Sequence, residues 1–265
     1  MRIAITYVCT GKYDVFWDEF YVSAEKYFYP YALKEYFVFT DSKRLLEEKN
    51  ERIHAFYQKK VGWPYDTLLR YNWFCTVQDL LGKFDFCYFC NANSKFLREV
   101  TAEIIPYPTE DKPLVFSIHI GYYEDTIGDT FTPERNEIST ACIPYGTPCR
   151  AYSGGFWGGA AAAFILMCQE IRNNIAIDMR NGYVAVWHDQ SHLERYAIDH
   201  AHQIIEKGLV ASEEYANNDF TLLIFRNKNA YGGNDALRGL TIKQRVYKLA
   251  ARVVKKMKKI MKVRI

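Results

Sequence analysis

Hydrophobic and polar positions in the first half of the chain form blocks of two alternating kinds. Short apolar runs that are typical of buried strands occupy residues 3–9, 36–40, 52–57 and 84–90. Helical patterns lie between them, at residues 14–28 and 65–83. In the first of these, an apolar stripe is formed by Val15, Phe16, Phe20 and Tyr27. Strands that alternate with helices predict an α/β fold, with a mixed, mostly parallel sheet flanked by helices.

The second half of the chain is less regular, and a long polar loop extends through Pro144. The elements expected there are strands at residues 114–120 and 220–229, a helix at 160–171, and a strand end followed by a helix start at 184–196. No internal repeat and no low-complexity linker precedes residue 240. We therefore expect one domain over residues 1–240.

The net charge of +3 hides an asymmetry between this domain and the end of the chain. Residues 1–240 contain 24 basic and 31 acidic residues, whereas residues 241–265, the basic tail, contain ten Lys or Arg and no acid. Apolar residues recur in the tail at helical spacing, at Ile242, Val246, Leu249, Val253, Met257, Ile260 and Met261. This pattern predicts a basic amphipathic helix on an anionic membrane surface. A partner-binding helix is an alternative, and the acidic body argues against a nucleic-acid arm.

The cysteines and the N-terminus indicate in which cellular compartment the protein is expected. Seven Cys residues show no metal-like spacing, and Cys87 and Cys90 would point to opposite faces of a strand. We expect buried free thiols in a reducing compartment. The N-terminus enters a strand pattern directly, without a signal peptide or a long apolar span, which favours a cytoplasmic protein. The aromatic content of 16% suits ring faces that bind sugars or bases, although an aromatic core explains it equally well.

Eight short motifs occur along the chain: CTGKY, YFVFTD, WPYDTLLR, DFCYFCNAN, IHIGYY, FTPERNEISTACIP, YSGGFWGG and VWHDQSHL. In this order, from Ile3 to Arg238, they resemble glycosyltransferase family 6, which includes the histo-blood-group A and B transferases. The resemblance implies a GT-A fold, with a donor-binding part at about residues 1–110 and an acceptor-binding part at about 111–240. It also implies transfer of N-acetylgalactosamine, or galactose, from a UDP-sugar in α-1,3 linkage to a β-galactoside, with retention. The absence of an N-terminal anchor points to the short bacterial branch.

The resemblance also assigns donor-binding residues. Uracil would stack on Tyr13, and the diphosphate would meet Lys228 and Arg238. The other donor-binding positions that it implies are Val8, Cys9, Thr10, Arg70, Ser153, Gly154, Gly155, His188 and Asp189. Gly155 lacks a Cβ, which leaves space for an acetamido group and favours N-acetylgalactosamine. Alternatively, these glycines merely permit close backbone approach, and the basic residues are solvated surface groups.

Asn91 and Asn93 stand where most members of the family have two aspartates that bind a divalent metal. Mg²⁺ and Mn²⁺ prefer anionic oxygens, and an amide oxygen is a weaker ligand. Two amides can still form hydrogen bonds with ribose and sugar hydroxyls. We therefore expect no metal and no other cofactor, with Lys228 and Arg238 balancing the charge of the leaving UDP.

The expected acceptor-binding residues are His119, Thr132, Trp187 and Gln190. Gln190 occupies the position of a family glutamate beside the anomeric carbon. An amide is a poor nucleophile, so we expect front-side attack, with Gln190, Asp189 and Lys228 as the catalytic groups. We do not expect Glu194, one helical turn further on, to replace the missing carboxylate. The alternative is a catalytically inactive UDP-sugar or glycan-binding protein. A lipid-linked acceptor at the inner face of the membrane would suit the basic tail.

Overall fold

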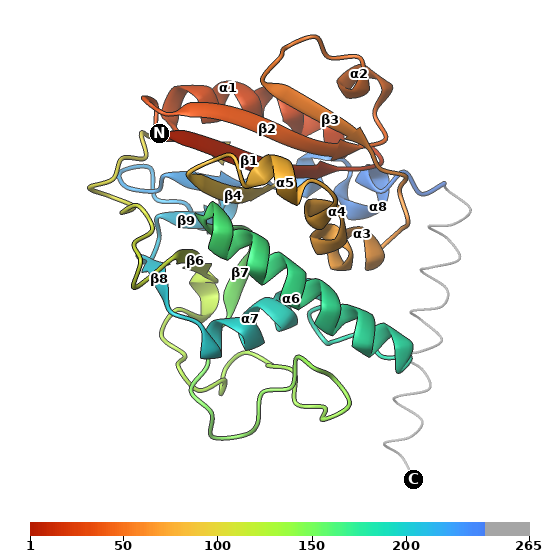
Figure 1. Ribbon diagram of the computed structural model, residues 1–265, viewed down its shortest axis with the longest axis vertical. Coiled ribbons are helices and arrows are strands. Elements are labelled where there is room, and N and C mark those ends of the chain that lie inside the picture. The colour runs from red at the N-terminus through yellow and green to blue at the C-terminus, as the bar shows by residue number, and fades with distance from the viewer. Residues whose placement is uncertain (242–265) are drawn as a thin grey trace.

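The computed structural model describes residues 1–241, so the predicted helix of the basic tail lies outside the described residues. Its centre is a seven-stranded sheet with the order β3-β2-β1-β4-β7-β6-β8 (Figure 1). The strands of this sheet are β1 (Arg2–Cys9), β2 (Leu33–Thr40), β3 (Ile53–Tyr57), β4 (Phe86–Asn91), β6 (Leu114–Ile118), β7 (Tyr152–Ala160) and β8 (His202–Ile205). A smaller sheet has the order β5-β10-β9, with β5 (Ser94–Phe96), β10 (Leu223–Phe225) and β9 (Val210–Ser212).

Helices flank the sheet, as the α/β prediction requires. The α-helices are α1 (Trp17–Tyr27), α2 (Lys43–Leu46), α3 (Tyr65–Leu68), α4 (Arg70–Thr76), α5 (Gln78–Leu81), α6 (Ala161–Arg180), α7 (Asp189–Asp199) and α8 (Gly233–Leu237). Short 3-10 helices are η1 (Tyr13–Phe16), η2 (Ile120–Tyr122), η3 (Glu213–Tyr215) and η4 (Lys228–Tyr231). The predicted fold class, a mixed and mostly parallel sheet between helices, is confirmed.

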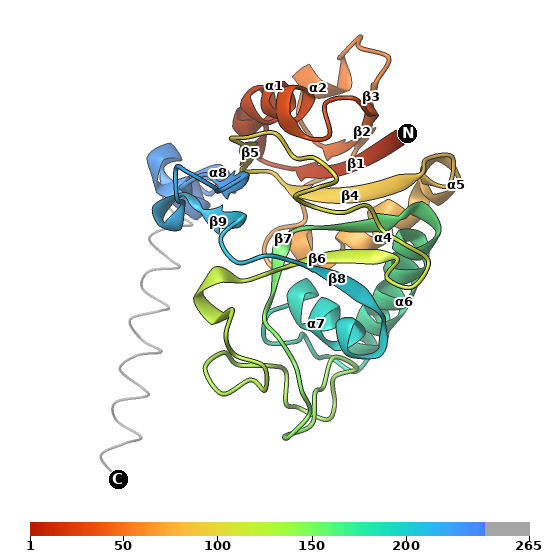
Figure 2. The same ribbon diagram turned by 90° about the vertical axis from the view of Figure 1, so that its left-hand side faces the viewer.

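Two hydrophobic clusters cover the two faces of the large sheet. One cluster joins alternate residues of β1 to Trp17 and Phe20 of α1 and to the small sheet. The other joins the opposite face to α4, α6 and α7. Cys87 belongs to the second cluster and Cys90 to the first, so strand alternation separates them as predicted. Figure 2 shows α1 and β5 on one side of β4, with α4 and α6 on the other.

Strand directions define the edge of the sheet where a ligand can bind. β1 runs parallel to β2 and β4, and Val8 at its end lies opposite Asn91. β7 runs antiparallel to both of its neighbours, β4 and β6. Its first residues therefore lie at the same edge as the last residues of β1 and β4. This is the edge at which open α/β sheets bind their ligands.

Four expectations about the elements differ from the structure. The strand expected at residues 220–229 is reduced to β10, and residues 228–231 form the 3-10 helix η4. Residues 65–83 form α3, α4 and α5 rather than one helix, with interruptions at Leu69 and at Val77, whose β-branched side chain has low helix propensity. No strand occurs at residues 184–187, where Val186 N donates to a Glu134 carboxylate oxygen at 2.8 Å. Val15 is 51% exposed, since residues 13–16 form the 3-10 helix η1 and the α-helical stripe begins later.

Candidate active site

A cavity of about 660 Å³ lies at the edge where β1, β4 and β7 meet. Sixteen of the expected site residues line it: Val8, Thr10, Tyr13, Arg70, Asn91, Asn93, His119, Ser153, Gly154, Gly155, Trp187, His188, Asp189, Gln190, Lys228 and Arg238. They come from strand ends, from the start of α7 and from the segment that contains η4 and α8. The fold thus brings together residues that span almost the entire described chain.

Cys9 and Thr132 are the two expected residues that do not line the cavity. The Cys9 side chain is fully buried in the core, and its carbonyl accepts a hydrogen bond from Thr40 Oγ1 at 2.9 Å. Thr132 is exposed, and its carbonyl accepts from the indole nitrogen of Trp187 at 2.9 Å. Thr132 therefore orients the tryptophan ring instead of facing the cavity itself.

The two amides of the Asn-x-Asn motif are bonded to each other and to the small sheet. Asn91 Nδ2 donates to Asn93 Oδ1 at 2.8 Å, and Asn93 Nδ2 donates to the Arg226 carbonyl at 2.7 Å. Arg226 N donates back to the Asn93 carbonyl at 2.7 Å. Both polar atoms of the Asn93 side chain are thus engaged within the protein. Because one of them is a donor, this pair fits a divalent cation poorly.

Metal-ligating side chains do not gather elsewhere in residues 1–241. No group of three or more His, Cys, Asp or Glu in this range has the arrangement of a metal site. All seven cysteines are free thiols, six of them buried. Burial raises the pKa of Cys9 to about 12, which makes it an inert core residue rather than a ligand or nucleophile.

Arg70 holds three elements together beneath the cavity. It is 5% exposed, and its guanidinium donates to the Gly154 carbonyl at 2.9 Å and pairs with Asp189 at 3.1 Å. Its remaining nitrogen donates to the Thr67 carbonyl at 3.0 Å. Burial raises the pKa of Asp189, and the charge of Arg70 opposes that shift. Arg70 therefore positions α7 against β7 and keeps a carboxylate at the cavity wall.

Two cations converge on the side of the cavity next to Tyr13. Lys228 Nζ lies 5.7 Å from the centre of the Tyr13 ring. Burial lowers the pKa of Lys228 to about 8, and the charges of Arg238 and then Arg70 add to the effect. An anionic ligand would reverse this repulsion and restore the full charge of the lysine. This part of the cavity is therefore suited to a diphosphate beside an aromatic ring.

Several further residues line the cavity, although none of them was predicted from the sequence as a site residue. They are Lys60, Trp63, Asp66, Thr67, Phe89, Ala92, Ser212, Glu214, Phe225, Arg226, Asn227, Asn229 and Asn234. The Trp63 ring lies 4.8 Å from that of His188 and 5.1 Å from the Arg238 guanidinium. Tyr13 donates from its hydroxyl to Asn234 at 3.1 Å. The motifs WPYDTLLR and DFCYFCNAN contain five residues of this group and were the local signal for them.

Gly155 does not have the open space that its lack of a side chain suggested. A Cβ at this position would lie 2.5 Å from Cζ of Phe225, so the phenylalanine ring already fills that volume. The glycine is required for the approach of β10 to β7, which is the alternative that the sequence left open. At Gly154, by contrast, a Cβ would meet Gln190 Oε1 at an ordinary 3.6 Å.

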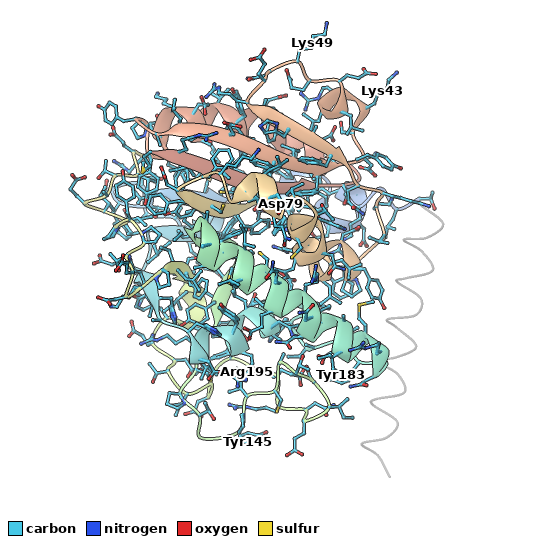
Figure 3. All side chains as sticks on the ribbon, in the orientation of Figure 1. Lys43, Lys49, Asp79, Tyr145, Tyr183 and Arg195 are labelled. Carbon is cyan, nitrogen blue, oxygen red and sulfur yellow. The ribbon has the colours of Figure 1, made fainter. Side chains whose placement is uncertain are left out.

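Three residues predicted from the sequence to bind the acceptor, His119, Trp187 and Gln190, line the same cavity. The His119 Nδ1 accepts from Gly121 N at 3.2 Å, which leaves Nε2 as the donor of the neutral ring. Burial lowers the pKa of His119 and so favours this neutral form. The Trp187 side chain is 47% exposed, and its ring is fixed by the bond to Thr132. Tyr145 lies on a loop that extends away from the large sheet (Figure 3).

A neutral histidine donor, a fixed indole ring and two cations line one cavity, an arrangement that is suited to a sugar nucleotide. The model of glycosyltransferase family 6 matches residues 1–218 of the chain. The chain belongs to glycosyltransferase family 6. It is therefore a glycosyltransferase, with a sugar donor and a glycan acceptor.

Relatives within family 6 come from bacteria and vertebrates. The O-antigen biosynthesis glycosyltransferase WbnI of Escherichia coli is 33% identical over 229 residues, which cover 86% of this chain and 95% of WbnI. The histo-blood group ABO system transferase 2 of Rattus norvegicus is 27% identical, over 75% of this chain and 59% of its own length. The globoside alpha-1,3-N-acetylgalactosaminyltransferase 1 of Gallus gallus is 25% identical, over 76% and 58% respectively. The chain thus spans under two thirds of these vertebrate relatives. Within residues 1–241, no helix is long and apolar enough to cross a membrane.

Proposed function

We propose that this family 6 enzyme transfers N-acetylgalactosamine, or alternatively galactose, from a UDP-sugar to a β-galactoside. The new bond would be an α-1,3 linkage formed with retention and without a metal ion. The observation on which this proposal rests is the engaged Asn93 side chain, which donates to the Arg226 carbonyl where a metal-binding carboxylate would be expected. The two cations Lys228 and Arg238, which line the same cavity, support the proposal as well.

The donor would lie with its uracil against Tyr13 and its diphosphate between Lys228 and Arg238. The negative charge on the β-phosphate increases as the bond to the sugar breaks, so fixed positive charge stabilises the transition state more than the ground state. Lys228 enters the reaction partly desolvated, which strengthens its interaction with the phosphate. Arg70 would act through Asp189 and Gly154 by fixing the walls around the sugar.

The reaction would proceed on one face of the sugar. The bond from C1 to the β-phosphate oxygen breaks, and UDP leaves with the electron pair. The 3-hydroxyl oxygen of the acceptor forms the new bond to C1 from the same side, and its proton passes to the departing β-phosphate oxygen. Front-side attack of this kind needs no enzyme carboxylate as nucleophile, which is consistent with an amide at Gln190.

The choice of sugar and acceptor draws on the relatives and on the cavity. One relative is named as an α-1,3-N-acetylgalactosaminyltransferase and another as an O-antigen glycosyltransferase. Phe225 fills the space beside Gly155, and a Cβ at Gly154 would already contact Gln190 and Asp189, so room for an acetamido group would have to come from another part of the cavity. We propose a β-galactoside within a lipid-linked surface polysaccharide precursor as acceptor, reached through binding of the basic tail to an anionic membrane.

Chelation tests the proposed metal independence. UDP release should be measured with UDP-N-acetylgalactosamine, UDP-galactose and a panel of β-galactosides, after extensive treatment with EDTA. We expect turnover to be retained and to change less than about two-fold on addition of Mn²⁺. A loss on chelation that Mn²⁺ restores would contradict the proposal. UDP-sugar binding without UDP release in the presence of any acceptor would instead indicate a sugar-binding protein.

A further inference from the structure

Gln190 and Glu194 form a pair on α7, one helical turn apart. The Nε2 of Gln190 donates to Oε1 of Glu194 at 2.9 Å. Glu194 has no exposed surface, and its Oε2 has no hydrogen-bond partner in the described part of the chain. A carboxyl group without exposure and with one unsatisfied oxygen is costly to keep in a protein core. The sequence offered no reason for an acid at this position.

The pair fixes which side of the Gln190 amide faces the cavity. Its NH₂ group is turned inward to Glu194, and its oxygen lies on the side of Gly154, where a Cβ would be 3.6 Å away. Gln190 and Gly154 both line the cavity, whereas Glu194 does not. The surface that a bound sugar meets is therefore the amide oxygen, the partially negative end of the group. Without an acceptor behind it, the amide could rotate and present its NH₂ instead.

We propose that Glu194 is a positioning residue that holds the Gln190 oxygen toward the anomeric carbon and adds its negative charge behind the amide. This inference rests on the proposed function. A hydrogen bond to a carboxylate polarises the amide and makes its oxygen more negative. That oxygen then stabilises the positive charge that develops at C1 as UDP leaves. Glu194 does not line the cavity itself, so its negative charge acts on the sugar through the polarised amide of Gln190.

The charge state of Glu194 changes in an accessible pH range. Burial raises the pKa of Glu194 to about 8, the hydrogen bond from Gln190 opposes the shift, and Asp189 on the same helix adds to it. The other titratable side chains that face it are Cys149 and Tyr152; burial raises the pKa of the Cys149 thiol and raises the pKa of Tyr152 to about 12. Glu194 is therefore mostly neutral at pH 6 and mostly ionised at pH 9.5. If its charge assists the reaction, kcat should rise as the pH increases between these values.

Lys228 titrates in the opposite sense and must be separated from this effect. Its pKa is about 8 in the free protein, and loss of its charge at higher pH would slow the reaction. A bound diphosphate raises the pKa of the lysine, and kcat at saturating donor reports groups in the complex. The rising limb of the kcat profile is therefore the one to assign to Glu194, and the falling limb belongs to the lysine.

The decisive variant is Glu194→Gln, which is isosteric with the protonated acid and can still accept from Gln190. We expect its kcat to lack the rising limb, remaining near the value of the unsubstituted enzyme at pH 6 and falling about ten-fold below it at pH 9.5. Asp199→Asn is the control on the same helix, since that side chain is 57% exposed and pairs only with the surface residue Arg195. Its profile should match that of the unsubstituted enzyme. Calorimetry with UDP should give the same Kd for all three proteins.

Exchange of the two side chains provides a second and independent measurement. Gln190→Glu alone replaces the NH₂ donor by a second acid, and at pH 9.5, where Glu194 is mostly ionised, repulsion between the two carboxylates should reduce kcat. In the double variant Gln190→Glu/Glu194→Gln, the amide at position 194 can donate to the carboxylate at position 190, so activity should recover by about ten-fold or more. A profile of Glu194→Gln equal to that of the unsubstituted enzyme, or a double variant no better than Gln190→Glu, would overturn the inference. Absence of turnover in the unsubstituted enzyme at every pH would overturn the proposed function, and this inference with it.

Discussion

Gly155 and Phe225 illustrate how a single contact decides the meaning of a residue. From the motif alone, a glycine beside the donor suggested room for an acetamido group. In the folded protein the Phe225 ring occupies that room, and Gly155 is the residue that allows it. At this scale, the properties of a side chain follow from the neighbour that the fold supplies, and not from its own type.

Substitution at Gly155 should therefore affect packing before it affects the choice of donor. We expect Gly155→Ala to destabilise the protein by about 1–3 kcal/mol, because its methyl group overlaps the Phe225 ring. Activity should decline in parallel with UDP-N-acetylgalactosamine and UDP-galactose. Thermal unfolding and kcat/KM with both donors measure the effect.

Two further variants check the cause. Gly154→Ala should unfold at the temperature of the unsubstituted protein, since a Cβ there makes only an ordinary contact. Gly155→Ala/Phe225→Leu should recover stability, because the smaller side chain removes the overlap. A normal Tm of Gly155→Ala, with a selective loss of the acetamido donor, would restore the original interpretation of Gly155.

At the scale of elements, Asn93 is the connection between the large sheet and the small one. It lies between β4 and β5, and its side chain and backbone both bond to Arg226, which follows β10. Arg226 is in turn held by ion pairs with Glu19 and Glu213. The motif beside the donor thus also attaches the segment that contributes Lys228 to the cavity.

Replacing this amide by an acid should weaken that attachment. In Asn93→Asp the donor to the Arg226 carbonyl becomes a second acceptor, so we expect a loss of about 1–3 kcal/mol in the free energy of unfolding. Asn234→Asp is a matched control, because the Asn234 side-chain oxygen accepts from the Tyr13 hydroxyl, and an aspartate can do the same. Urea unfolding of both variants compares them. Equal stability of Asn93→Asp and the unsubstituted protein would show that the Arg226 contact is dispensable.

The sequence predicted the regular elements well and the irregular ones poorly. The strands β1, β2, β3, β4 and β6 follow apolar runs, and α6 follows a long helical pattern. The strand β7 was not predicted, because its glycines conceal the alternation of apolar and polar side chains. At Gly159 the backbone packs closely, since a Cβ there would lie 2.5 Å from the Pro113 carbonyl oxygen. The short strands β5 and β8 depend on pairing partners far along the chain, which no local pattern encodes, and β9 has only three residues.

The residues of the candidate site also fall into those that were predicted from the sequence and those that were not. Residues in recognisable motifs, such as His119 and Asp189, line the cavity. Trp63 and Asn234 were not anticipated, since each reaches the cavity through contacts between segments more than 100 residues apart. Glu194 is a different case: its position was visible, but its bond to Gln190 depends on the helix beginning at Asp189.

At the scale of the whole molecule, charge is divided between an acidic body and the basic tail. Residues 1–240 would be repelled by an anionic membrane, whereas the tail would be attracted by about 1 kcal/mol for each Lys or Arg near the surface. The last described residues follow Arg238, which lines the cavity. A tail bound to a membrane would therefore hold the donor side of the cavity close to it.

Removal of the tail should separate location from chemistry. We expect a chain that ends after Leu240 to lose sedimentation with vesicles that contain anionic lipid, while its kcat with a soluble β-galactoside stays within about two-fold. Neutral vesicles serve as the control, and neither protein should bind them. Equal binding of both proteins to anionic vesicles would refute a role of the tail in membrane association.

The antiparallel strand β7 also has a consequence for synthesis of the chain. β4 pairs with β1 on one edge and with β7 on the other, but β7 begins at Tyr152, about 60 residues after β4 ends at Asn91. At roughly 5–20 residues per second, a ribosome needs roughly 3–12 seconds to produce that interval. During this interval the backbone N–H and C=O groups along one edge of β4 have no strand partner, and such edges can pair with other chains. The nascent protein therefore passes through a period of vulnerability to aggregation, which ends when β7 inserts between β4 and β6.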